Sequence, residues 1–72
     1  MEIEIFGQLS IDQEHRRTLK IDQAMTVFEV AKLIGLNTEL IGLITIDGVQ
    51  SELQDVVMEN NRLCFFPYMS GG

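Results

Sequence analysis

The chain has one cysteine, one histidine and one proline among its 72 residues, and no apolar run approaches the roughly 18 residues of a membrane span. The lone cysteine, Cys64, excludes an internal disulfide framework and indicates a reducing compartment. The N-terminus also lacks the basic and then apolar pattern of a secretory signal. These absences predict a soluble, cytoplasmic protein that does not bind membranes.

Basic residues are scarce as well: five Lys and Arg stand against eleven Asp and Glu, for a formal net charge of -6. An acidic surface repels phosphate backbones, so we expect no nucleic-acid partner. The excess of acid fits solubility, and it also fits steering toward a basic partner.

Patterns that carry catalysis are missing from the chain. Its glycines upstream of residue 70 are isolated, so no phosphate-binding loop is predicted. His15 lies in a charged loop with no second ligand at metal spacing, which predicts a solvated histidine and no metal site. Cys64 has no histidine near it in sequence, and Ser70 has no evident base, so neither is predicted to be a nucleophile. We therefore expect no enzyme that acts alone.

One helix is marked clearly. Thr26 and Glu29 have the spacing of a capping box, in which each side chain bonds the backbone amide of the other residue. Gly35 is suited to the position just past the helix end. The core-facing stripe between them is predicted to comprise Val27, Val30, Ala31 and Ile34.

Short strands surround this helix and give the order β-β-α-β-β-β. They are predicted at residues 1–6, 18–21, 41–46, 49–50 and 62–66, from alternating or continuous apolar runs bounded by turn residues. Residues 10–17 read as a loop, residues 22–25 lead into the helix, and residues 51–58 form either one helical turn or an irregular segment. The order predicts an α+β fold of β-grasp type: a mixed sheet of four to five strands curled around one main helix. Residues 1–67 then form the domain and residues 68–72 a flexible tail.

In this arrangement the first and last strands lie side by side in the middle of the sheet. If Ile3, Ile5, Leu63 and Phe65 face the helix, then Glu2, Glu4, Phe6, Cys64 and Phe66 face away from it. The apolar members of the second group predict a patch that binds a partner. The alternative is a strand register shifted by one residue, which moves every side chain to the other face.

The last eight residues, 65–72, end in two glycines. Pro67 cannot donate to a strand ladder and is expected to stop the final strand. Gly71 and Gly72 have no side chains, so they fit a narrow channel and leave the Gly72 carboxylate accessible to activation. A small acidic domain with such an end is suited to be a substrate and carrier.

Residues 65–72 resemble the MoaD ending of two aromatics, two prolines, a hydrophobic residue, Ser or Thr, and Gly-Gly. The element order over the whole chain resembles the ThiS/MoaD sulfur carriers of the ubiquitin-like β-grasp superfamily, and Thr26 with Val27 opens the helix as in both branches. Tyr68 departs from the pattern by replacing the second proline, and residues 60–61 (Asn-Asn) replace the usual Asp-Gly-Asp turn. The length is nearer to ThiS, whereas the Phe-Phe-Pro sequence is closer to MoaD.

The resemblance implies a sulfur carrier with no bound cofactor. A MoeB- or ThiF-like enzyme would use ATP to adenylate Gly72, with Gly71 beside it, and a sulfur donor would convert the adenylate to a thiocarboxylate. A MoaE-like large subunit would then use the sulfur to build molybdopterin; in the ThiS alternative, a ThiG-like thiazole synthase would receive it for thiamine. The residues expected to contact partners are Phe6, Val49, Phe66, Pro67 and Tyr68. A ubiquitin-like protein modifier and a purely non-covalent binding module remain as the other hypotheses.

Overall fold

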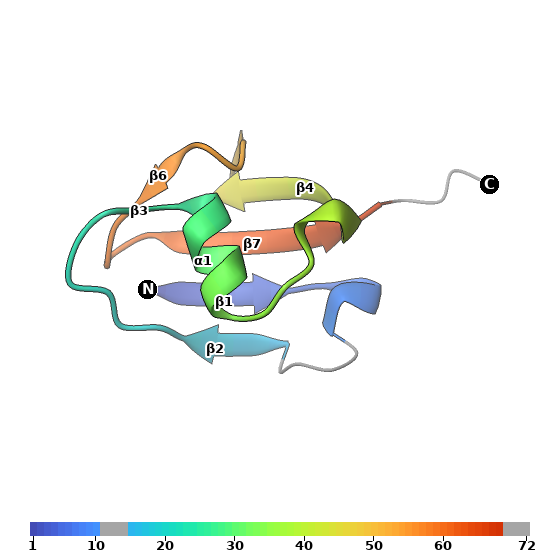
Figure 1. Cartoon of the computed structure of the whole chain (residues 1–72), viewed down its shortest axis with the longest axis horizontal. Helices are drawn as coiled ribbons and strands as arrows, with labels where there is room; N and C mark the ends of the chain where they lie inside the picture. The colour runs from blue at the N-terminus through green and yellow to red at the C-terminus, as the bar shows by residue number, and fades with distance from the viewer. Residues whose placement is uncertain (11–14, 69–72) are drawn as a thin grey trace.

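The computed structural model describes residues 1–10 and 15–68 (Figure 1). The predicted Gly71 and Gly72 site lies outside these residues. The elements, in chain order, are β1 (Glu2–Ile5), the 3-10 helix η1 (Gly7–Ser10), β2 (Arg16–Thr18), β3 (Met25–Thr26), α1 (Val27–Leu33), the 3-10 helix η2 (Thr38–Leu40), β4 (Ile41–Ile46), β5 (Val49–Ser51), β6 (Val56–Val57) and β7 (Arg62–Pro67).

Five strands form one mixed sheet in the order β2-β1-β7-β4-β5, and α1 crosses one face of it (Figure 1). The β1 and β7 strands pair in parallel at the centre, whereas the other pairs are antiparallel. This is the β-grasp arrangement, with the first and last strands adjacent as predicted. None of the helices within residues 1–10 and 15–68 has the length and apolarity needed to span a membrane.

The helix α1 begins and ends where the sequence predicts. The Thr26 hydroxyl accepts a hydrogen bond from the Glu29 amide at 3.1 Å, and the Glu29 carboxylate accepts one from the Thr26 amide at 2.9 Å. Gly35 follows the cap residue Ile34 with a φ of 78°, a conformation that glycine adopts without strain. Because α1 has only seven residues, its stability depends on packing against the sheet.

The core lies between α1 and the sheet face that it covers. Strand alternation places Ile3, Ile5, Leu63 and Phe65 on that face, each fully buried. The predicted helix stripe is buried against them, at Val27, Val30, Ala31 and Ile34. The register predicted for β1 and β7 is therefore confirmed, and the alternative of a one-residue shift is wrong.

The predicted bounds of the second strand are wrong. The second strand covers Arg16–Thr18 instead of residues 18–21, because pairing with Glu2–Glu4 fixes its position. Its predicted apolar residue Ile21 is still buried, but it belongs to the following loop, and its amide donates to Glu59 at 2.7 Å.

A second, two-stranded sheet was not predicted. The sequence predicts that residues 22–25 lead into the helix, yet Met25–Thr26 forms β3 and pairs with β6. The strand β6 lies within residues 51–58, for which the sequence predicts either one helical turn or an irregular segment. The amide of Val27 donates to the Asp55 carbonyl at 2.9 Å, so the same segment also binds the first amides of the helix. The small sheet thus ties the helix start to residues 55–57.

Candidate docking face and tail root

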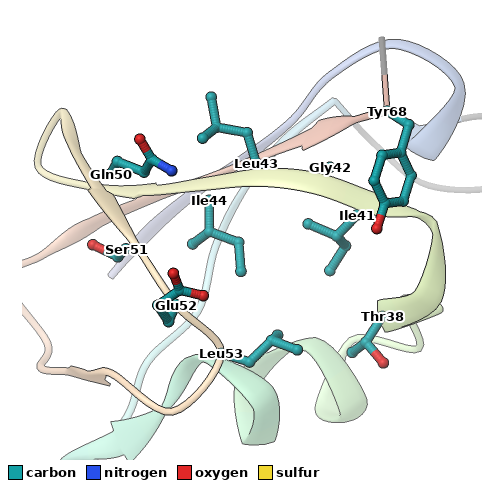
Figure 2. Close-up of a pocket in the computed structure, with 10 residues that line it drawn as sticks. All are labelled: Thr38, Ile41, Gly42, Leu43, Ile44, Gln50, Ser51, Glu52, Leu53 and Tyr68. Carbon is teal, nitrogen blue, oxygen red and sulfur yellow. The ribbon is translucent and has the colours of Figure 1, made fainter. Parts of the chain in front are cut away.

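The sheet face opposite α1 carries an apolar patch formed by Phe6, Leu43 and Phe66. The Phe6 and Phe66 rings stack with centroids 4.6 Å apart and an interplanar angle of 2°. Leu43 is the register partner of Phe66 on β4, and its side chain is 38% exposed. Figure 2 shows Leu43 on the side of β4 opposite to Ile44, which faces the core. We call these three residues the outer patch.

Sequence reasoning found Phe6 and Phe66 but missed Leu43. The run Ile41–Ile46 is almost continuously apolar, so its composition does not reveal which residues face outward. The available signal was alternation: if Ile44 packs inward, Leu43 must point outward.

Cys64 does not extend the outer patch as predicted. It faces the same side of the sheet, but it is buried, between its register partners Glu4 on β1 and Thr45 on β4. The thiol is therefore a packed group.

Glu4 lies on the face away from the helix, as predicted, but the residue is only 4% exposed. Arg62 hydrogen-bonds one of its carboxylate oxygens, and Nη2 of Arg16 lies 3.5 Å from the other. His15 approaches the same oxygen with Nε2 at 3.8 Å and sets its ring edge-on against Phe6 at a centroid distance of 4.8 Å. His15 is therefore exposed outside the strands, as predicted, and its ring also packs edge-on against Phe6.

The hydrogen bond from Arg62 holds the pKa of Glu4 below its usual value, with further help from the charges of Arg62 and Arg16, although burial opposes them. The same contact raises the pKa of Arg62. Glu4 therefore stays ionised at neutral pH and is unsuited to general acid–base work. Within residues 1–10 and 15–68, no group of three His, Cys, Asp or Glu residues could hold a metal ion.

The tail root, by which we mean Pro67 and Tyr68, directly follows Phe66 of the outer patch along the chain. Strand β7 runs through the middle of the sheet and ends at Pro67, as predicted, where it pairs with Ile41. Tyr68 follows with 69% of its surface exposed. Its ring lines an open hollow of about 260 Å³ between β4, β5 and η2, together with Ile41 and Thr38 (Figure 2).

Val49 is separate from the outer patch. It is 66% exposed, but its register partner is Ile46, whose side chain packs against the core. Facing residues of an antiparallel pair share one side of the sheet, so Val49 lies on the side opposite to Phe6 and Phe66. The structure therefore brings Phe6 and Phe66 together in the outer patch. Pro67 pairs with the buried Ile41, and Tyr68 lines the hollow beside Ile41, so these two residues follow Phe66 along the chain without joining the patch.

No family model matches the chain, and no curated protein matches it. Among solved structures, the chain is similar to the crystal structure of SAMP1 from Haloferax volcanii, with a TM-score of 0.75 and 20% sequence identity. The match covers 99% of this chain and 97% of that one. At this identity the likeness concerns the fold, and it confirms the ubiquitin-like β-grasp that the sequence predicts.

Proposed function

We propose that this protein is a sulfur carrier for molybdopterin biosynthesis, whose Gly72 carboxylate is adenylated by a partner enzyme and then converted to a thiocarboxylate. The proposal requires Gly72 to be the last residue of the functional protein. It assigns the catalysis to the partners, a MoeB- or ThiF-like adenylating enzyme and a MoaE-like large subunit, and it places the protein in the cytoplasm. The ubiquitin-like fold, shared by small modifiers and sulfur carriers, supports a role of this kind.

The observation that carries the proposal is the position of the outer patch next to the tail root. Phe66 and Pro67 are consecutive residues, so a partner that covers Phe6, Leu43 and Phe66 also receives the chain leaving the sheet at Tyr68. The patch combines two half-buried aromatic rings with the exposed Leu43, and partly exposed apolar side chains gathered at one site are typical of docking surfaces. A rigid central strand fixes the distance between that surface and the start of the tail.

The chemistry needs no catalytic group from this chain. An oxygen of the Gly72 carboxylate attacks the α-phosphorus of ATP and pyrophosphate leaves, which gives an acyl adenylate. The terminal sulfur of a persulfide donor attacks the acyl carbon and AMP leaves, which gives an acyl disulfide. A thiol then attacks the donor's sulfur, which releases the thiocarboxylate and forms a disulfide between that thiol and the donor. The buried Cys64 takes no part in these steps.

The first test measures pyrophosphate release by a MoeB- or ThiF-like enzyme from the same genome. We expect release that depends on the carrier and that disappears when Gly71 and Gly72 are deleted. The variant Phe66→Ala should raise KM for the carrier, because it removes half of the aromatic stack. Pyrophosphate release that survives the deletion contradicts the proposal.

The partner distinguishes the molybdopterin role from the thiamine alternative. A stable complex with a MoaE-like subunit, and none with a ThiG-like thiazole synthase, is the expected result of mixing the purified proteins. The reverse result assigns the chain to thiazole synthesis, and adducts on protein lysines assign it to protein modification.

A further inference from the structure

Two glycines that are far apart in the sequence lie against the tail root. A Cβ atom added to Gly42 would be 2.7 Å from the Pro67 carbonyl oxygen and from the backbone nitrogen and Cα of Tyr68. A Cβ atom added to Gly7 would be 2.8 Å from Cγ of the Pro67 ring. Ordinary van der Waals contact begins near 3.4 Å, so neither position has room for a side chain.

The sheet register explains why Gly42 comes so close. Ile41 pairs with Pro67 and Leu43 pairs with Phe66, which leaves Gly42 as an extra residue on β4. A bulge of this kind bends its strand, and glycine in a strand often marks a close backbone approach. The backbone of Gly42 is thereby pressed against the bond that joins Pro67 to Tyr68.

Gly7 lies on the other side of the tail root, against the Pro67 ring. It follows β1 with a φ of 60°, and the amide of Phe6 donates to the Phe65 carbonyl at 3.0 Å, which keeps this turn beside β7. The root of the tail is therefore flanked by the end of β1 on one side and the start of β4 on the other.

We propose that Gly42 and Gly7 are positioning residues that set the direction in which the chain leaves the sheet at Tyr68. This inference rests on the proposed function, since its consequence is the delivery of Gly72 to a partner's active site. An alanine at position 42 must push the tail root away by about 0.7 Å to restore contact at 3.4 Å from the present 2.7 Å. A misplacement of about 1 Å at a reacting group lowers rates by about a hundredfold.

The test compares three alanine variants. Gly42 has no positive φ, so Gly42→Ala introduces only the contact with the tail root. Gly7→Ala has two effects: its side chain contacts the Pro67 ring, and its positive φ strains the backbone. Gly48→Ala is the control, since Gly48 has a φ of 83°, comparable with that of Gly7, but nothing lies within 4 Å of its added Cβ.

In the adenylation assay we expect Gly42→Ala and Gly7→Ala to lower kcat by roughly tenfold to a hundredfold. Their KM should be unchanged, because Phe6, Leu43 and Phe66 still dock. Gly48→Ala should be less stable yet keep the wild-type kcat.

An NMR measurement tests the same contact without any enzyme. We expect a nuclear Overhauser effect between the α protons of Gly42 and Tyr68, and a shift of the Tyr68 amide signal in Gly42→Ala but not in Gly48→Ala. Wild-type kcat in Gly42→Ala, or an unmoved Tyr68 signal, overturns the inference. If the wild type is not adenylated at all, the proposed function fails, and the NMR result alone then decides whether the glycines fix the tail root.

Discussion

Alanine substitutions at Phe65 and Phe66 test which side of β7 faces the core. The two residues are adjacent and chemically identical, but Phe65 is fully buried on the side of the sheet that faces the helix. There it lies between its register partners Ile5 on β1 and Ile44 on β4. Phe66 is half-buried on the other side and stacks on Phe6. The same change should therefore have very different effects on the free energy of unfolding.

The expected magnitudes follow from these environments. Truncating a fully buried Phe65 to alanine costs about 3–5 kcal/mol. Phe66→Ala loses a stacking contact of about 0.5–1.5 kcal/mol and some buried area, so we expect about 1–2 kcal/mol. A domain of 72 residues has a total stability of about 4–11 kcal/mol, at about 0.05–0.15 kcal/mol per residue. Phe65→Ala should remove much or all of it.

The assay is chemical denaturation followed by far-UV circular dichroism. If Phe65→Ala is unfolded without denaturant, Phe65→Leu and Phe66→Leu supply a measurable pair, in which the first should be the more destabilising. Phe66→Ala should also weaken binding to the adenylating enzyme, while its circular dichroism spectrum shows the same helix and strand content as the wild type. Equal or greater destabilisation at Phe66 refutes the register and, with it, the outer patch.

Two further predictions concern stability. Thr26→Ala should lower the free energy of unfolding by about 1 kcal/mol, seen as a drop in Tm, because it leaves the Glu29 amide without its cap; no change, or loss of the fold, contradicts this. Stability should also fall as the pH drops below about 4.5. In the folded state the hydrogen bond from Arg62 lowers the pKa of Glu4, and the hydrogen bond from the Ile21 amide lowers the pKa of Glu59. Both carboxylates therefore contribute fully to the free energy of unfolding above the unfolded-state pKa of 4.5, and this contribution is lost as the pH falls through their folded-state pKa values. Denaturation curves between pH 7 and pH 3 check this, with Glu4→Gln expected to flatten the slope; stability that rises toward low pH contradicts it.

The sequence predicts the elements that local chemistry marks strongly. The Thr26 and Glu29 spacing identifies the helix start, and the turn at Asp47 and Gly48 separates β4 from β5, with φ values of 51° and 83°. Strand alternation then assigns the faces of β1 and β7 correctly. Each of these signals lies within a few residues, so a single sequence is sufficient to see it.

The features that the sequence does not predict depend on contacts between residues that are distant in sequence. Glu4 is buried because Arg62, 58 positions later, reaches it across the central strands. Gly42 and Gly7 read as isolated glycines until the register brings both against Pro67. The strands β3 and β6 have two residues each, too few for any periodicity.

The most direct test of the central claim is the mass of the intact protein after incubation with its adenylating enzyme, ATP and a persulfide donor. The account predicts the exchange of one oxygen for sulfur, located at Gly72 by fragmentation. The exchange should require ATP and be absent when Gly71 and Gly72 are deleted. A protein that never gains sulfur while its enzyme and donor are active on another carrier contradicts the account.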